Sequence, residues 1–404
     1  MIFGMNFFRR FQTKTRRVFL DFASITPLDP QLKAEMEKYE TEVFSNPSAL
    51  YGDALVAKEA VKESREKIAR ILDATKESII FTSGGTESNN LAIFGVFNAW
   101  KSESFTPHFI TTAFEHPSVL EVFKEIESCG GEVSYAEVSE DGFVNPKTIA
   151  SLLRPTTVLV SVMYANNEIG TIQPLHTISR ELKEWRAKNP AKESIPYFHS
   201  DASQASLYLP LNIHKLGVDL LTLDGIKMYG PRGAGVLFAK PIVKMRPVLF
   251  GGGQEKGLRS GTENVPAIVG LASALEIADK MKEKESLRLT EIRDYAIQEI
   301  LSRFPKASLN GSQKNRLPNN INICFPGRDA EFAVISLDVL GISASYSSSC
   351  RTLKEDSSSY VVESLGKAGC AMSSLRFTLG RETRAEDIDF LLAALEKVAV
   401  NQQE

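Results

Sequence analysis

The chain has 404 residues, of which 43% are hydrophobic and 24% are charged, and its net charge is −3. This composition is typical of a folded globular protein, and the length suffices for one large core with a smaller domain beside it. The charges nearly balance, and no apolar run approaches the roughly 20 residues of a membrane span. We therefore expect neither direct nucleic-acid binding nor a membrane partner.

The four cysteines include no closely spaced pair such as CxxC. The sequence therefore predicts no metal site and no disulfide framework. A reducing, cytoplasmic location is the default expectation for such a chain. The cysteines are Cys129, Cys324, Cys350 and Cys370.

Residues 1–17 form a basic extension that contains no acid and four phenylalanines. We interpret this segment as a disordered extension or the product of a misplaced start codon. Weak organelle targeting or membrane-surface binding is the alternative, because the segment is basic and rich in aromatic residues.

From residue 18 to about residue 265, short apolar runs alternate with amphipathic helical patterns such as residues 54–73. Near-continuous apolar strands separated by helices predict an α/β fold with a mostly parallel central sheet covered by helices. Ligands of such sheets bind at the carboxyl ends of the strands. The runs that we interpret as strands are 78–81, 108–111, 158–162, 197–198, 220–223 and 235–238.

After residue 265 the pattern changes to a long helical stretch, a strand near 319–325, a helix near 330–340 and a final helix over 384–399. This pattern predicts a second, smaller α+β domain over 266–404. The large domain then covers 18–265, and its first residues can pack on the small domain.

Asp201 and Lys227 follow two successive predicted strands. Pyridoxal phosphate (PLP) needs a lysine for its Schiff base, and a carboxylate beside its pyridine nitrogen keeps that nitrogen protonated. These two residues are candidates for the two roles. Acids and lysines are common, so the pair gains weight only from its neighbours.

Two glycine-containing segments are candidates for phosphate binding. Residues 82–87 follow a strand and open a helix, where free N–H groups attract an anion. A plain strand-to-helix turn capped by Thr86 is the alternative. The glycine-rich loop 251–262 either wraps a phosphate or is merely mobile.

Four further polar residues have both a functional and a structural interpretation. His116 either stacks on a cofactor ring and relays protons or is a structural histidine, and Asn167 either binds a ligand or belongs to a turn. Cys350, among small polar residues, is a candidate reactive thiol. Arg376, in an apolar strand, binds either a substrate carboxylate or an acid of the protein.

The order of these segments resembles the cysteine desulfurases of the NifS/IscS type, in the class V aminotransferase group. The resemblance runs from about residue 18 to residue 400. It rests on LDFAS at 20–24, SNPS at 45–48, SGGTES at 83–88, EH at 115–116, NNEIG at 166–170, HSDASQ at 199–204, KMYGP at 227–231, RSGT at 259–262, Cys350 and RFTLG at 376–380.

The resemblance implies a fold-type I PLP enzyme that forms a homodimer, takes L-cysteine and passes sulfur from a persulfide on Cys350 to a protein scaffold or carrier. A selenocysteine lyase, another class V enzyme and a catalytically weak sulfur-transfer scaffold remain alternatives. By position, the resemblance assigns the Schiff base to Lys227, the pyridine nitrogen to Asp201, the ring hydroxyl to Gln204, ring stacking and proton transfer to His116, the phosphate to Gly85, Thr86 and the neighbouring subunit's Thr262, the substrate carboxylate to Asn167 and Arg376, and the catalytic thiol to Cys350.

Two positions depart from the family pattern. The usual serine and histidine before the lysine, which help to hold the phosphate, are Asp224 and Ile226 here. At about 4 Å and an effective dielectric constant near 20, two like unit charges repel by roughly 4 kcal/mol. Asp224 must therefore point away, be protonated or pair with a cation such as Arg232, and we expect weak PLP retention.

Overall fold

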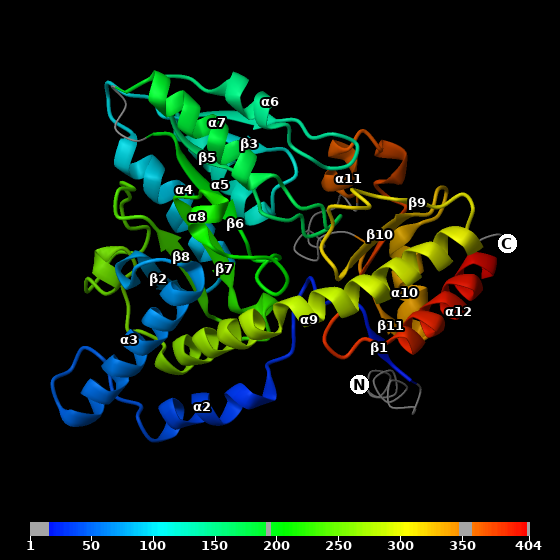
Figure 1. Ribbon diagram of the computed structural model, residues 1–404, viewed down its shortest axis with the longest axis horizontal. Helices are drawn as coiled ribbons and strands as arrows, with labels where there is room; N and C mark the ends of the chain where they lie inside the picture. The colour runs from blue at the N-terminus through cyan, green and yellow to red at the C-terminus, as the bar shows by residue number, and fades with distance from the viewer. Residues whose placement is uncertain (1–15, 191–194, 347–357, 402–404) are drawn as a thin grey trace, which may run out of the picture.

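The structure is a computed structural model that describes residues 16–190, 195–346 and 358–401. Its centre is a seven-stranded sheet in the order β2-β8-β7-β6-β5-β3-β4, in which only β8 runs antiparallel to its neighbours (Figure 1). The prediction of a mostly parallel central sheet is confirmed. The strands are β2 (Ile79–Thr82), β3 (His108–Thr112), β4 (Glu132–Ala136), β5 (Thr157–Ser161), β6 (Tyr197–Asp201), β7 (Leu220–Asp224) and β8 (Gly235–Ala239).

Helices cover both faces of this sheet, because neighbouring apolar residues of a strand point to opposite faces. Phe109 packs in the cluster that includes α4 and α5, whereas Ile110 packs in the larger cluster on the other face. The helices are α2 (Pro30–Thr41), α3 (Gly52–Leu72), α4 (Gly85–Trp100), α5 (Pro117–Ser128), α6 (Pro146–Leu152), α7 (Leu175–Lys188), α8 (Ile213–Leu216), α9 (Val265–Arg303), α10 (Ala330–Val339), α11 (Tyr360–Ser364) and α12 (Ala385–Asn401).

The C-terminal part contains a second, antiparallel sheet in the order β12-β10-β9. The first described strand also lies there, because β1 pairs in parallel with β11. The bounds of these strands are β1 (Val18–Phe19), β9 (Ser308–Leu309), β10 (Asn320–Cys324), β11 (Ile342–Ser343) and β12 (Ser374–Thr378), and the short 3₁₀ turns are η2 (Lys76–Ser78), η3 (Gly225–Lys227), η4 (Glu255–Gly257) and η6 (Ala368–Cys370).

Helix α9 runs through the predicted boundary between the two domains. Asn264 caps the helix by accepting a hydrogen bond from the backbone N–H of Ala267, and the 39 residues continue without a break to Arg303. The first half of α9 packs on α2 and α3, and its far end lies beside α12 and β10 (Figure 1). The division at residue 265 stays a prediction.

A disulfide joins Cys324 of β10 to Cys370 of η6, with the two Cα atoms 5.4 Å apart. The expectation that the cysteines form no disulfide was wrong for this pair. The pair is separated by 46 residues in sequence and meets only because β12, which follows Cys370, returns beside β10. Cys324 is fully buried, as its apolar context predicted. The expectation of a reducing, cytoplasmic location rested partly on the absence of paired cysteines, and this disulfide removes that argument.

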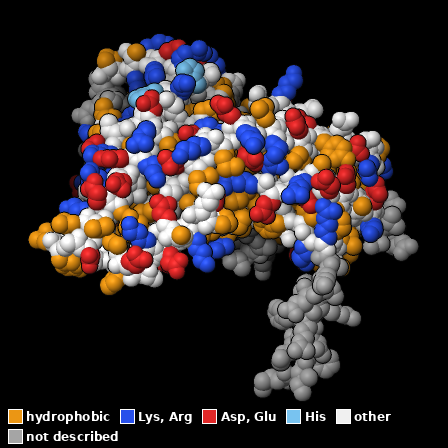
Figure 2. All heavy atoms as spheres, turned by 60° about the horizontal axis from the view of Figure 1, so that its bottom comes forward, with side chains coloured by type: hydrophobic (Ala, Val, Ile, Leu, Met, Phe, Trp, Pro, Cys, Tyr) orange, Lys and Arg blue, Asp and Glu red, His pale blue; other side chains and the backbone are white. Residues whose placement is uncertain are grey.

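One part of the surface is markedly hydrophobic. Exposed hydrophobic side chains gather on the loop between α2 and α3 and on the first turn of α3 (Figure 2). They are Phe44, Leu50, Tyr51, Leu55 and Val56. Within the described ranges, no helix is both long and apolar enough to cross a bilayer, and no group of three or more acid, histidine or cysteine side chains is placed to hold a metal ion.

Candidate active site

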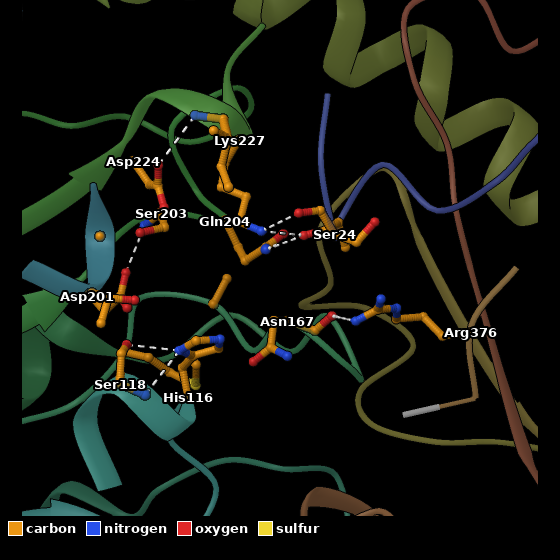
Figure 3. A pocket seen from close by; sticks show the side chains of 16 residues that line it. Ser24, His116, Ser118, Asn167, Asp201, Ser203, Gln204, Asp224, Lys227 and Arg376 are labelled. Carbon is orange, nitrogen blue, oxygen red and sulfur yellow. Dashed lines mark hydrogen bonds between the residues drawn. The ribbon is translucent and has the colours of Figure 1, made fainter. Parts of the chain in front are cut away.

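One pocket collects most of the predicted site residues at the carboxyl ends of β5, β6 and β7 and the start of α4 (Figure 3). Parallel strands place the residues that follow them at one edge of a sheet, which explains the gathering. The residues that line the pocket are Ala23, Ser24, Gly85, Thr86, His116, Ser118, Met163, Ala165, Asn167, Asp201, Ser203, Gln204, Asp224, Ile226, Lys227 and Arg376.

Asp201 ends β6 with both carboxylate oxygens held. Oδ1 accepts a hydrogen bond from the backbone N–H of Ser203 at 2.9 Å, and Oδ2 accepts from Asn89 Nδ2 at 2.8 Å. His199 lies two residues earlier on the same strand, and burial lowers its pKa to about 4. Asp201 is thus fixed in orientation beside a neutral imidazole. The contribution of Asn89 could not be predicted from the sequence, because Asn89 lies on α4, far from Asp201 along the chain.

The amine of Lys227 lies against the segment that follows β1. Its Nζ donates to the carbonyl oxygens of Ala23 at 3.0 Å and Ser24 at 2.5 Å. Gln204 Nε2 donates to the same Ala23 oxygen at 2.9 Å. Figure 3 shows both side chains meeting at this segment. The structure therefore places Lys227 and Gln204 side by side, as the site prediction requires.

His116 caps α5, and its ring is oriented by Ser118. The backbone N–H of Ser118 donates to Nδ1 at 3.2 Å, so the neutral ring carries its proton on Nε2. Burial lowers the pKa of His116, and the positive charges of Lys227 and Arg376 lower it further, while Asp201 raises it. The imidazole is therefore neutral and can donate a hydrogen bond from Nε2. The role of Ser118 was missed in the sequence, because it exists only once the cap has formed.

Glu115 is a buried acid directly beside His116. Its Oε1 accepts from Thr112 Oγ1 at 2.7 Å and from the Met163 backbone N–H at 2.8 Å, and its Oε2 has no hydrogen-bond partner in the part of the chain that the structure describes. Burial raises the pKa of Glu115 to about 8. The sequence marked the Glu115–His116 pair as part of the resemblance but assigned the acid no role. Glu115 is a neutral acid near neutral pH.

Arg376 supports both interpretations that its sequence context allowed. It is 2% exposed, and its Nη2 pairs with Asp21 Oδ1 at 2.8 Å while Nη1 donates to the Asn167 carbonyl oxygen at 3.0 Å. A salt bridge within the protein is therefore present. Among the described residues, its Nε and the Oδ1 of Asn167 are nevertheless buried without hydrogen-bond partners, and both residues line the pocket. The site thus has unsatisfied polar atoms at the end where the substrate carboxylate is expected.

The turn before α4 is shaped for close approach of a ligand to the backbone. Gly84 has φ +152° and supplies no side-chain cap, so Thr86 does not cap the helix as the alternative proposed. Gly85 and Thr86 line the pocket instead. Ser203 joins them, because its Oγ lies 3.2 Å from the position of a β-carbon on Gly85. The start of α4 therefore faces the pocket, and the first backbone N–H groups of a helix favour an anion.

Asp224 lines this same end of the pocket and does not point away from it. Arg232 is exposed and, in the part of the chain that the structure describes, forms no ion pair with Asp224. Burial raises the pKa of Asp224 above its ordinary value, although Lys227 and the backbone N–H groups of Gly85 and Ile226 lower it. Among the described residues, the carboxyl group of Asp224 therefore neither points away from the site nor pairs with Arg232.

One described residue of the predicted site does not line the pocket, and another predicted residue lies outside the described ranges. Thr262 is exposed on the glycine-rich loop and is not among the lining residues. This loop is tied to the protein, because Arg259 pairs with Glu87 of α4 at 2.8 Å and Glu255 pairs with Arg65 of α3 at 2.6 Å. Cys350 lies outside the described residues. The roles of Thr262 at a neighbouring subunit and of Cys350 stay predictions.

Comparison with known proteins places this pocket in a family. The model of the class V aminotransferases matches residues 18–391. The chain belongs to this family, on its cysteine desulfurase branch. The cysteine desulfurase IscS of Dictyoglomus turgidum is 41% identical over 95% of this chain and 94% of that protein. The predicted α/β fold of the family is confirmed by these matches and by the solved structures of two relatives.

Both solved structures cover nearly the whole chain. A NifS-like protein superposes with a TM-score of 0.87 and 31% identity, over 95% of this chain and all of that one. A structure described as SspA in complex with cysteine superposes with a TM-score of 0.76 and 31% identity, over 90% of this chain and 99% of that one. The family likeness therefore extends over nearly the whole chain and is not confined to the pocket.

Proposed function

We propose that this chain converts L-cysteine to L-alanine and leaves the sulfur as a persulfide on Cys350 for delivery to an acceptor protein. The observation that carries the proposal is a single pocket that joins Asp201, Lys227 and Arg376 in a chain related to cysteine desulfurases over nearly its full length. The cysteine named in the description of one solved relative supports the choice of substrate.

The ring end of the pocket fits PLP. Lys227 would hold the cofactor's aldehyde, Asp201 its pyridine nitrogen and Gln204 its hydroxyl oxygen, while Gly85 and Thr86 would face its phosphate. The fit rests on the oriented carboxylate of Asp201 and on the amine of Lys227 aimed into the same space. When bound, PLP supplies the electron sink that lets a proton leave the substrate α-carbon.

Side chains of the pocket would orient the substrate and transfer its protons. Arg376 and Asn167 orient the substrate carboxylate and so fix the direction of the Cα–H bond. Lys227 removes the α-proton. His116, neutral and protonated on Nε2, handles the proton of the substrate thiol.

Sulfur transfer requires a nucleophile. In our proposal the thiolate of Cys350 attacks the sulfur of the substrate. A sulfur–sulfur bond forms, the substrate carbon–sulfur bond breaks, and the electron pair left on that carbon takes up a proton to give alanine. Atoms and electrons balance with no external oxidant, because cysteine and a thiol become alanine and a persulfide.

Replacement of the nucleophile tests the proposal. We expect Cys350→Ser to abolish sulfide release from L-cysteine, measured in the presence of a dithiol reductant by a methylene blue assay, while PLP absorbance is retained. Cys129→Ser is the matched control, because Cys129 is a free cysteine at the end of α5, far from the pocket in sequence and fold. Sulfide release by the Cys350→Ser protein at the wild-type rate would reject the assignment.

Other parts of the proposal concern partners. A homodimer is supported by the exposed hydrophobic cluster of the α2–α3 loop, since contiguous apolar patches on a surface mark interaction sites. The acceptor is a protein scaffold or sulfur carrier, and a cytoplasmic location belongs to the same proposal. Sedimentation at micromolar concentration tests the dimer, and a monomer would contradict it.

A catalytically weak sulfur-transfer scaffold is the second candidate. Asp224 and Ile226 favour it, because neither side chain binds a phosphate as the usual serine and histidine do. The sulfide assay separates the two functions. Turnover of L-cysteine supports the desulfurase, and its absence in the PLP-saturated protein supports the scaffold.

A further inference from the structure

The carboxylate of Asp224 occupies the anion-binding end of the pocket. A β-carbon built on Gly85 would lie only 3.0 Å from Asp224 Oδ2, and one on Gly84 would lie 3.7 Å from Oδ1. The carboxylate therefore rests against the first turn of α4. Figure 3 shows Asp224 beside Ser203 on the pocket wall, on the same side as Lys227.

The strand order explains how Asp224 reaches this turn. Strand β8 lies between β2 and β7, and Gly235 is the register partner of both Thr82 and Asp224. A β-carbon on Gly235 would lie 2.6 Å from the Cα of Gly84. Because Gly235 has no side chain, the turn after β2 closes down on β8 and comes within reach of the acid on β7.

The surroundings of Asp224 are those of a bound anion. The backbone N–H of Ile226 donates to Oδ1 at 3.2 Å, and the N–H of Gly85 also interacts with the carboxylate. The start of a helix favours negative charge because its N–H groups and dipole point toward the ligand. The chain thus carries its own anion where the family's cofactor places a phosphate.

We propose that Asp224 is an internal competitor for the cofactor phosphate. While Asp224 is ionised, this chain prefers PLP to unphosphorylated pyridoxal only weakly, and the preference increases when Asp224 takes up a proton. The inference rests on the proposed function, since it assumes that PLP occupies this pocket. It adds to that function a pH-dependent preference for the phosphorylated cofactor over pyridoxal, which the protonation of Asp224 controls.

The charges around Asp224 determine the direction of the pH dependence. Lys227 of η3 lowers its pKa, Asp201 of β6 raises it, and burial is the largest cause of the net rise. On α4, Glu87 is engaged by Arg259. A phosphate dianion placed beside Asp224 raises the pKa of Asp224 further, because like charges favour the neutral acid. Phosphate binding is then coupled to proton uptake, and the preference for PLP grows as pH falls.

The test compares two aldehydes that differ only in the phosphate. Dissociation constants of PLP and pyridoxal are measured by absorbance titration of the whole chain between about pH 6 and about pH 8.5, a range that starts near the second phosphate pKa of about 6. Their ratio cancels the pH dependence of the aldehyde reaction with Lys227. Four proteins are compared: wild type, Asp224→Ser, Asp224→Asn and Asp141→Ser. Asparagine at position 224 keeps the shape of the acid without its charge, and Asp141→Ser is the control because it removes an exposed acid elsewhere.

We expect the wild-type preference for PLP over pyridoxal to fall as pH rises. At the upper end of the pH range, Asp224→Ser and Asp224→Asn should have a preference for PLP that is roughly 10- to 100-fold greater than that of wild type. The phosphate's own titration is common to all four proteins, so a steeper pH dependence in wild type and Asp141→Ser identifies Asp224. Strong, phosphate-dependent binding by wild type, equal to that of the Asp224 variants, overturns the inference and leaves the proposed function intact. Failure of all four folded proteins to bind either aldehyde overturns the proposed function, and the inference with it.

Discussion

At the scale of single residues, burial holds Glu115 and His116 in their neutral forms although they are adjacent in sequence. The acid has a pKa of about 8, and the pKa of the histidine is lowered. Glu115 binds the backbone N–H of Met163, which lines the pocket, so a neutral carboxylic acid positions the pocket wall next to a neutral imidazole. Proton handling by His116 therefore starts from a neutral imidazole.

Glu115→Gln tests this description through stability. The pKa of Glu115 is higher in the folded chain than the ordinary value of 4.5, so the folded state binds the proton more tightly and loses stability as pH rises from 4.5 to about 8. Glutamine keeps the shape and the acceptor oxygen but cannot ionise. In urea denaturation the wild-type free energy of unfolding, relative to the variant, should fall by up to about 1.4 kcal/mol per pH unit over that range. Parallel curves for the two proteins would contradict a neutral Glu115.

At the scale of elements, the contact between β8 and the turn before α4 depends on the absence of a side chain at Gly235. We expect Gly235→Ala to destabilise the fold by roughly 1–3 kcal/mol, because its β-carbon would lie 2.6 Å from backbone atoms of Gly84. PLP affinity should fall as well, since the turn is displaced. Gly52→Ala is the control, because its β-carbon would meet nothing within 4 Å. Equal stability of the two variants in chemical denaturation would refute the close contact.

The disulfide between β10 and η6 is a second link between elements. Cross-linking residues 46 apart restricts the unfolded chain, so reduction or Cys370→Ser should lower the free energy of unfolding by roughly 2–4 kcal/mol. Cys129→Ser should leave stability unchanged, because Cys129 is free. Thiol counting by mass spectrometry under denaturing, non-reducing conditions checks the bond directly. Reactivity of all four cysteines toward an alkylating reagent would show that the bond is absent.

At the scale of the whole molecule, the sequence predicted the functional residues that directly follow a strand of the central sheet. Apolar runs located the central strands, and the polar residues after them, Asp201 and Lys227 above all, meet at one edge of the sheet as the rule for parallel sheets requires. Residues whose function depends on tertiary contact were not predictable. Asn89 supports Asp201 from α4, and Cys370 reaches Cys324 only through the pairing of β10 with β12.

The position of the Asp224 carboxylate could not be predicted from the sequence, and the arrangement of the pocket explains why. The sequence marked it as a departure with several outcomes, and only the placement of Gly235 between two strands decides where the carboxylate lies. Long-range register is set by the whole sheet, so no local pattern contains it.

The proposed function depends above all on the amine of Lys227 as the attachment point of PLP in this pocket. The direct measurement is borohydride reduction of the intact chain with excess PLP at about pH 6.5, where the Asp224 inference expects stronger phosphate binding, followed by peptide mapping. We expect a pyridoxyl group on Lys227 and its loss in Lys227→Ala. A wild-type map in which Lys227 is unmodified, or in which the label persists undiminished on other lysines of Lys227→Ala, would contradict it.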